Sequence, residues 1–251
     1  MKKLFALLIV ATVLMSIPLV AAANSKPQVS KIVFIHRKDS FGKPEWAVKP
    51  PKDDPDPQLY ELMGKYIKWT SLELTCHINP TNDDDLTETF VMSNITASAE
   101  TWDQASTAEV FATYVLNYTA AVDADSPDGY NEVAFGSIAD ENAIAVCIVW
   151  FIRGGPPSQR GIVEFDILFN DASYTWGYAG ETNEDAPNQD YLDIMDLQNI
   201  ATHELGHALG LADLYSDECS EQTMYGYGAY GETKKRTLNS GDKEGIQVLY
   251  G

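Results

Sequence analysis

The stretch "HELGHALGLAD" at residues 203–213 constrains this chain more than any other. In a helix, residues four apart share one face, so His203 and His207 can bind the same cation. A zinc site that does chemistry needs three protein ligands and one open position. Gly210 can end the helix, because glycine tolerates positive φ, and the chain then turns back to offer Asp213 as the third ligand. Glu204 would face the open position, where a water can lie between its carboxylate and the metal.

A bare HExxH pattern also occurs by chance on ordinary amphipathic helices. Here the preceding residues extend the helical pattern, since "LDIMDLQNIATHELGHALGL" (192–211) has a broad apolar face. Asp193 or Asp196 can cap its N-terminus. The two histidines therefore fall inside a predicted helix, as metal binding requires.

Residues 1–23 have the pattern of a cleavable signal peptide. They contain Lys2 and Lys3, then an apolar run, then a patch of small residues that ends in three alanines. The alternative is an uncleaved membrane anchor, because the apolar run is long for a signal core. The prediction is a secreted protein, associated with a membrane only if this segment is retained.

The mature chain would be strongly acidic, with 37 Asp and Glu against 15 Lys and Arg, a net charge of −22. This charge argues against a nucleic-acid partner. Most of the carboxylates are expected to form a solvated surface. Asp171, Glu181, Asp185 and Asp190 crowd one loop-rich stretch, so a structural Ca²⁺ ion remains open as a second cofactor, although no calcium-loop motif is present.

Three cysteines, Cys76, Cys147 and Cys219, allow one disulfide with a free thiol, or no disulfide. The remaining histidines, His36 and His77, have no partner at metal-ligand spacing. We interpret both as ordinary strand or surface residues.

The chain divides near residue 66 into a leader (24–66) and a single domain (67–251). The leader contains "KIVFIHRKD" (31–39), a plausible short strand, and then a proline-rich, charged segment (43–58) that is typical of extended chain. A pro-region, an ordered appendage and a tether all remain open for this leader.

The domain has the pattern of an α+β fold. Five apolar, β-branched segments predict a five-stranded sheet, and residues 86–106 carry Leu86, Phe90, Ile95 and Trp102 at helical spacing. The histidine helix follows, then a loop rich in glycine and tyrosine (214–237), and a short closing helix. The predicted strands lie near residues 71–78, 110–120, 131–138, 143–152 and 161–170.

These motifs resemble the metzincin clan of zinc endopeptidases. The pattern HExxHxxGxxD, followed by Met224 in "EQTMYGYG", is similar to the clan's zinc helix and to its Met-turn, in which a methionine packs beneath the metal. Within the clan the matrixins are most similar, and the resemblance spans about residues 66–251. It implies a zincin fold: a twisted, mixed five-stranded sheet backed by two long helices, an active-site helix that ends at a glycine, a Met-turn subdomain and a C-terminal helix.

Three features depart from the matrixin pattern. Matrixins use histidine as the third ligand, whereas Asp213 resembles the aspartate of snapalysin-type peptidases. The matrixin pro-region motif, in which a cysteine plugs the zinc, is absent, since Cys76 lies in a predicted strand. Gly226 and Gly228 stand where the family usually has a proline and a tyrosine in the wall of its specificity pocket.

The resemblance implies a secreted zinc endopeptidase that cleaves extended proteins or peptides with Glu204 as general base. We expect the protein to be a monomer. The strand from Ala143 to Trp150 would be the sheet edge above the cleft and would pair with substrate backbone. Tyr225 and Tyr227 are candidates for lining the pocket or steadying the oxyanion. Two other classes remain: a secreted zinc-containing binding module that cleaves nothing, and an acidic cell-surface protein without metal.

Overall fold

The computed structural model describes residues 28–38, 59–64, 67–156, 160–180 and 193–251. The predicted signal peptide (1–23) and proline-rich segment (43–58) lie outside these residues, as do Glu181, Asp185 and Asp190 of the acidic stretch. No helix in the described ranges is long and apolar enough to cross a membrane. Cys76, Cys147 and Cys219 are all buried.

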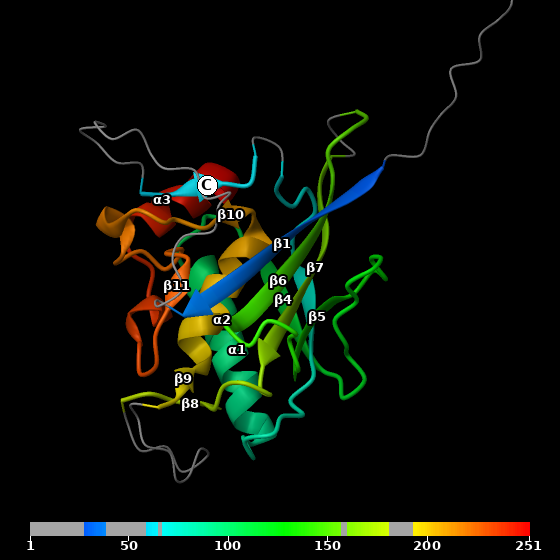
Figure 1. The fold of residues 1–251 in the computed structure, drawn as a ribbon. Coiled ribbons are helices and arrows are strands. Elements are labelled where there is room, and N and C mark those ends of the chain that lie inside the picture. Colours follow the sequence, from blue (N-terminus) through cyan, green and yellow to red (C-terminus); the bar gives the residue numbers. More distant parts are fainter. Residues whose placement is uncertain (1–27, 39–58, 65–66, 157–159, 181–192) are drawn as a thin grey trace, which may run out of the picture.

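The architecture is α+β, as the sequence predicts (Figure 1). The α-helices are α1 (Glu88–Asp103), α2 (Leu197–Leu209) and α3 (Ser240–Tyr250). The strands are β1 (Val29–Lys38), β2 (Glu61–Leu62), β3 (Leu74–Ile78), β4 (Phe111–Leu116), β5 (Asn131–Gly136), β6 (Ala143–Ile152), β7 (Gly161–Asn170), β8 (Trp176–Gly177), β9 (Met195–Asp196), β10 (Leu211–Ala212) and β11 (Tyr227–Gly228).

The main sheet has seven strands in the order β11-β1-β6-β7-β5-β3-β4. All five predicted strands form, as β3 to β7. Strands β4, β3, β5 and β7 run parallel, whereas β6 is antiparallel to β7. The two extra strands are β1, from the leader, and the two-residue β11; the sequence could not show that they would join the same sheet, because strand pairing between distant segments depends on tertiary contacts.

The predicted helix α1 buries one apolar face against the sheet and against α2. Its Thr87 caps the N-terminus by accepting a hydrogen bond from the Phe90 amide at 3.1 Å. Leu86, Phe90, Ile95 and Trp102 are all buried. Trp102 also donates from its indole Nε1 to the Thr202 carbonyl at 2.8 Å, which fixes α1 to α2.

Helix α2 runs through the interior, and only Gln198 among its thirteen residues escapes full burial. Of the two predicted caps, Asp196 is the N-cap, and it accepts from the Asn199 amide at 2.8 Å. Gly210 ends the helix in the left-handed region with φ of 109°. A Cβ at this position would lie 2.5 Å from the Ile67 carbonyl oxygen, so both the turn and the close packing require glycine.

The described part of the leader packs onto the domain. Strand β1 pairs with β6 along its whole length, and β2 pairs with β10 just after Gly210. The predicted short strand in the leader is therefore confirmed. The strand that the resemblance places at the sheet edge, Ala143–Trp150, lies within β6, and in this structure β1 pairs with it.

Candidate metal centre and active site

His203 and His207 meet on the buried face of α2. Their Nε2 atoms lie 3.1 Å apart, and both side chains are fully buried. Each Nδ1 contacts a backbone carbonyl, that of Thr223 at 2.7 Å for His203 and that of Leu211 at 2.9 Å for His207. A carbonyl oxygen only accepts, so each Nδ1 carries the hydrogen and donates it. Both Nε2 atoms then point to the same place, and in the neutral form of each ring Nε2 carries the lone pair.

Asp213 completes this arrangement from the segment that follows Gly210. Its Oδ1 lies 3.2 Å from Nε2 of His203 and 3.3 Å from Nε2 of His207. Its Oδ2 accepts a hydrogen bond from the Tyr215 hydroxyl at 3.0 Å. Three potential ligand atoms thus converge within 4.8 Å of one another. Two imidazoles with one carboxylate fit the ligand set of a catalytic zinc ion.

The buried residues around the three converging atoms shift one another's pKa values. Burial, followed by the charge of Lys235, lowers the pKa of His203 to about 3. Burial alone would raise the pKa of Asp213, but the two histidines beside it hold that pKa well below its usual range. Asp213 is therefore an anion and His203 is neutral, which are the forms that ligate a metal. Burial alone would lower the pKa of His207, but the charge of Asp213 outweighs burial and raises that pKa. A metal that binds here therefore displaces a proton from His207.

Glu204 lies beside the two histidines and is fully buried. Its Oε1 is 3.2 Å from Nδ1 of His36, and within the described residues its Oε2 has no hydrogen-bond partner. Burial raises the pKa of the Glu204 carboxyl to about 8. A carboxyl group with a pKa near neutrality can both accept and return a proton.

Met224 packs under α2, between the turns that carry the two histidines. A Cβ at Gly206 would lie 2.2 Å from the Met224 sulfur, so that glycine makes the space for the methionine. The turn around Met224 is held by Asp242 of α3, which accepts from the backbone amides of Thr223 at 2.7 Å and Met224 at 3.1 Å. The same turn supplies the Thr223 carbonyl that orients His203.

The two predicted loop tyrosines pack together next to Tyr215, whose hydroxyl bonds to Asp213. Tyr227 is buried in β11, and its ring packs against Tyr225 and Tyr215, with centroids 5.5 Å apart in both pairs. Sequence reasoning missed Tyr215, whose hydroxyl bonds to Asp213. Gly226 makes room for it, because a Cβ there would lie 2.5 Å from the Tyr215 ring.

Sequence reasoning also missed His36, and its interpretation as an ordinary strand or surface residue is wrong. His36 is 1% exposed, and its ring centroid lies 4.0 Å from that of His203. Its Nε2 is 3.2 Å from Nζ of Lys235, a fully buried lysine in the short helix η4 (Lys234–Arg236). Lys235 also donates to the carbonyls of Tyr225 and Tyr227. No spacing in the sequence links residue 36 to residue 203, so only the fold reveals this contact.

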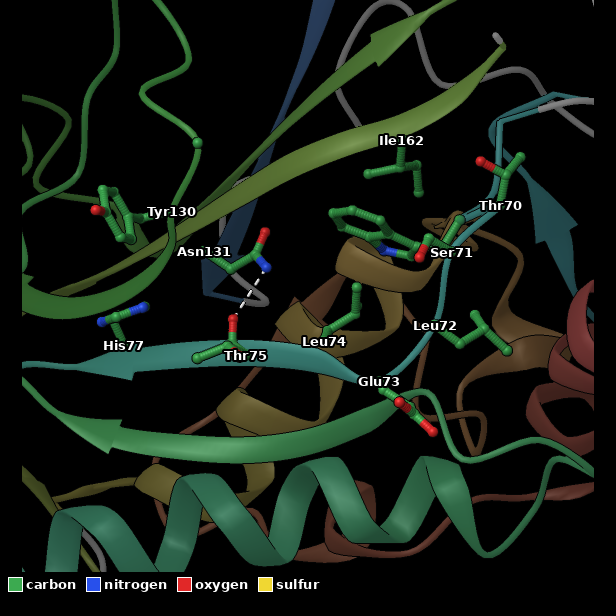
Figure 2. A pocket seen from close by; sticks show the side chains of 12 residues that line it. Thr70, Ser71, Leu72, Glu73, Leu74, Thr75, His77, Tyr130, Asn131 and Ile162 are labelled. Carbon is green, nitrogen blue, oxygen red and sulfur yellow. Dashed lines mark hydrogen bonds between the residues drawn. The ribbon is translucent and has the colours of Figure 1, made fainter. Parts of the chain in front are cut away.

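His77, by contrast, is an ordinary residue of β3. It lines an open pocket of about 480 Å³ beside Thr75, Tyr130 and Asn131 (Figure 2), where its ring meets the edge of Tyr130. None of the residues that surround the converging histidines lines this pocket. It is a surface hollow, separate from the candidate metal centre.

Comparison with protein-family models gives a match to the matrixin family of peptidases over residues 68–251. The chain belongs to the matrixin family, which places it among the zinc-dependent metalloendopeptidases. Matrixins are generally secreted or extracellular. A search of curated proteins finds no match.

Proposed function

We propose that this chain is a secreted zinc endopeptidase in which His203, His207 and Asp213 hold the metal. The observation that carries the proposal is the convergence of three potential ligand atoms in a site where both Nδ1 atoms already donate to carbonyls. When bound, zinc supplies a Lewis acid that polarises the scissile carbonyl and makes a water more acidic.

Glu204 acts as the general base. Its carboxylate takes a proton from the attacking water and passes it to the leaving amine. Tyr215 positions Asp213 through its hydroxyl hydrogen bond. Met224 supports the site from below by packing against Gly206.

The substrates are extended proteins or peptides, with Tyr225 and Tyr227 lining the specificity pocket. The net charge of −20 for the whole chain disfavours nucleic acid as a partner. Residues 1–23 serve as the signal peptide, residues 67–251 form the catalytic domain, and the protein acts as a monomer. A structural Ca²⁺ ion remains a separate prediction.

Metal content and hydrolysis, measured together on the full chain, test the proposal. We expect one zinc per chain and chelator-sensitive cleavage of casein. Glu204→Gln should keep zinc and lose hydrolysis, while the matched surface change Glu218→Gln leaves both unchanged. Asp213→Ala should lose zinc, whereas Asp217→Ala on the exposed helix η3 (Asp217–Cys219) should not.

Two results would contradict the mechanism. Hydrolysis that survives in zinc-loaded Glu204→Gln removes Glu204 as the base, and full zinc occupancy in Asp213→Ala places the third ligand elsewhere. The competing function, a zinc-containing binding module, predicts zinc without cleavage even when the site is opened. Hydrolysis is therefore measured both in the wild-type chain and in Phe34→Ala/His36→Ala, which removes two side chains that cover His203 and His207.

A further inference from the structure

Strand β1 of the leader lies in the position where the proposed function requires substrate. It lies between β6 and β11 in the sheet (Figure 1). It is antiparallel to β6, with His36 opposite Ala145. It is parallel to β11, with Arg37 opposite Tyr227. The family resemblance assigns β6 to the edge that pairs with substrate and the segment around β11 to the pocket wall. An extended segment of this chain already bonds to both.

The inward side chains of β1 cover the converging histidines. Phe34 and His36 alternate with outward residues along the strand, so both face α2. The Phe34 ring stacks on His207 with centroids 3.8 Å apart and planes 9° from parallel. His36 packs on His203 and contacts Glu204 through Nδ1. The proposed base is thus paired with the leader, and no substrate can reach it in this conformation.

The domain has a space that fits His36. Gly228 stands where the family usually has a larger side chain, and a Cβ there would lie only 2.9 Å from Nε2 of His36. Lys235 contacts the same nitrogen. Because an ammonium group only donates, this contact leaves Nδ1 of the neutral imidazole to donate to Glu204. His36 is therefore held in one orientation by groups of the domain.

Charge also favours this docking. Residues 29–38 carry three Lys or Arg and no acid, whereas residues 67–251 carry seven Lys or Arg against 31 Asp or Glu, a net charge of −24. Arg37 forms an ion pair with Asp140 at 3.0 Å. A basic strand is attracted to an acidic domain, and it meets an edge that would otherwise be unpaired.

We propose that residues 29–38 are an internal inhibitor strand, which fills the substrate groove between β6 and β11 and holds Glu204 through His36 until the strand is displaced. This inference rests on the proposed function. It differs from latency through a cysteine that plugs the metal, because here a strand in the groove and a histidine at the base do the blocking.

Weakening the inward contacts of β1 in the full, zinc-loaded chain tests the inference. Phe34→Ala/His36→Ala removes both covering side chains, and Val29→Ala/Val33→Ala is the matched control, because both valines are 39% exposed. We measure zinc content, hydrogen exchange of the β1 amides, and binding and hydrolysis of fluorescein-labelled casein. In the opened variant, the β1 amides should exchange faster and casein should be hydrolysed at least about tenfold faster. The free energy lost on truncating a buried phenylalanine is larger than the amount that shifts the population of undocked β1 tenfold. The control should stay within about twofold of wild type.

The outcomes separate the two proposals. Wild type that hydrolyses casein as fast as the opened variant, with β1 still protected, overturns the inhibitor strand and leaves the endopeptidase standing. An opened variant that keeps zinc and binds casein without cutting it supports the strand as the occupant of the groove but refutes the endopeptidase. An opened variant that neither binds nor cuts casein refutes the inhibitor strand.

A second variant tests the same idea without removing the covering side chains. Val33 and Ile148 are directly opposite in the antiparallel pair, a geometry that a disulfide can bridge. In Val33→Cys/Ile148→Cys, oxidation should abolish the residual hydrolysis, because β1 can no longer leave, and a reductant should restore it. Equal hydrolysis before and after reduction would overturn the inference.

Discussion

Gly210 determines where the third candidate ligand lies, so Gly210→Ala is the most informative single change to the fold. Two costs follow from the structure. An L-residue with φ of 109° loses about 1–2 kcal/mol relative to glycine. The added methyl group would also lie 2.5 Å from the Ile67 carbonyl oxygen, a backbone atom that cannot rotate away. Overpacking of this kind costs about 1–3 kcal/mol.

We therefore expect Gly210→Ala to lower the free energy of unfolding by about 3 kcal/mol, and the melting temperature by roughly 6–12 °C. The matched control is Gly129→Ala. Gly129 has a similar φ of 96°, but no atom lies within 4 Å of an added Cβ, so only the conformational cost applies. Urea unfolding with a chelator measures both variants without metal. The measurement is then repeated with zinc. Zinc should stabilise Gly210→Ala less than wild type, because the turn at Gly210 also positions the ligand Asp213.

Equal losses in the two glycine variants would refute this reasoning. They would mean that the Ile67 contact relaxes at little cost and that the turn after α2 is not rigidly packed. A large stability loss with unchanged zinc affinity would instead separate the turn from the metal centre.

Three further outcomes are expected. Saturating zinc should raise the free energy of unfolding by about 4 kcal/mol at a thousandfold excess over its dissociation constant, and a chelator should remove this gain in a melting experiment. Tyr215→Phe removes the hydroxyl that bonds to Asp213, so zinc affinity in a competition titration should fall about 10- to 100-fold, and an unchanged affinity would exclude a positioning role. Burial, and then the negative charges of Glu164 and Glu132, raise the pKa of Asp166 to about 8. The folded state therefore retains a proton that the unfolded state releases, and the free energy of unfolding falls as pH rises from about 4 to 8. Asp166→Asn should therefore stabilise the protein by at least about 1 kcal/mol at pH 8 and leave it unchanged at pH 4, and an equal effect at both pH values would contradict the assignment.

The sequence by itself determined the features that depend on local spacing. His203 and His207 lie four residues apart, so any helix brings them together, and Gly210 supplies a conformation that few other residues adopt. The sequence also limited the N-cap of this helix to Asp193 or Asp196, and Asp196 accepts from the amide of Asn199, three positions along the chain. The five strands of the domain follow from runs of apolar residues that only a buried sheet accommodates.

Only the tertiary structure decided which distant segments meet at the candidate site. His36 is 167 residues from His203 in the chain, and Lys235 is 199 residues from His36, so no periodicity links them. Strand β1 is a short apolar run in a leader, and its sequence does not say which sheet edge it joins. That edge follows from the unpaired backbone groups of β6 and the space beside Gly228, which exist only once the chain has folded.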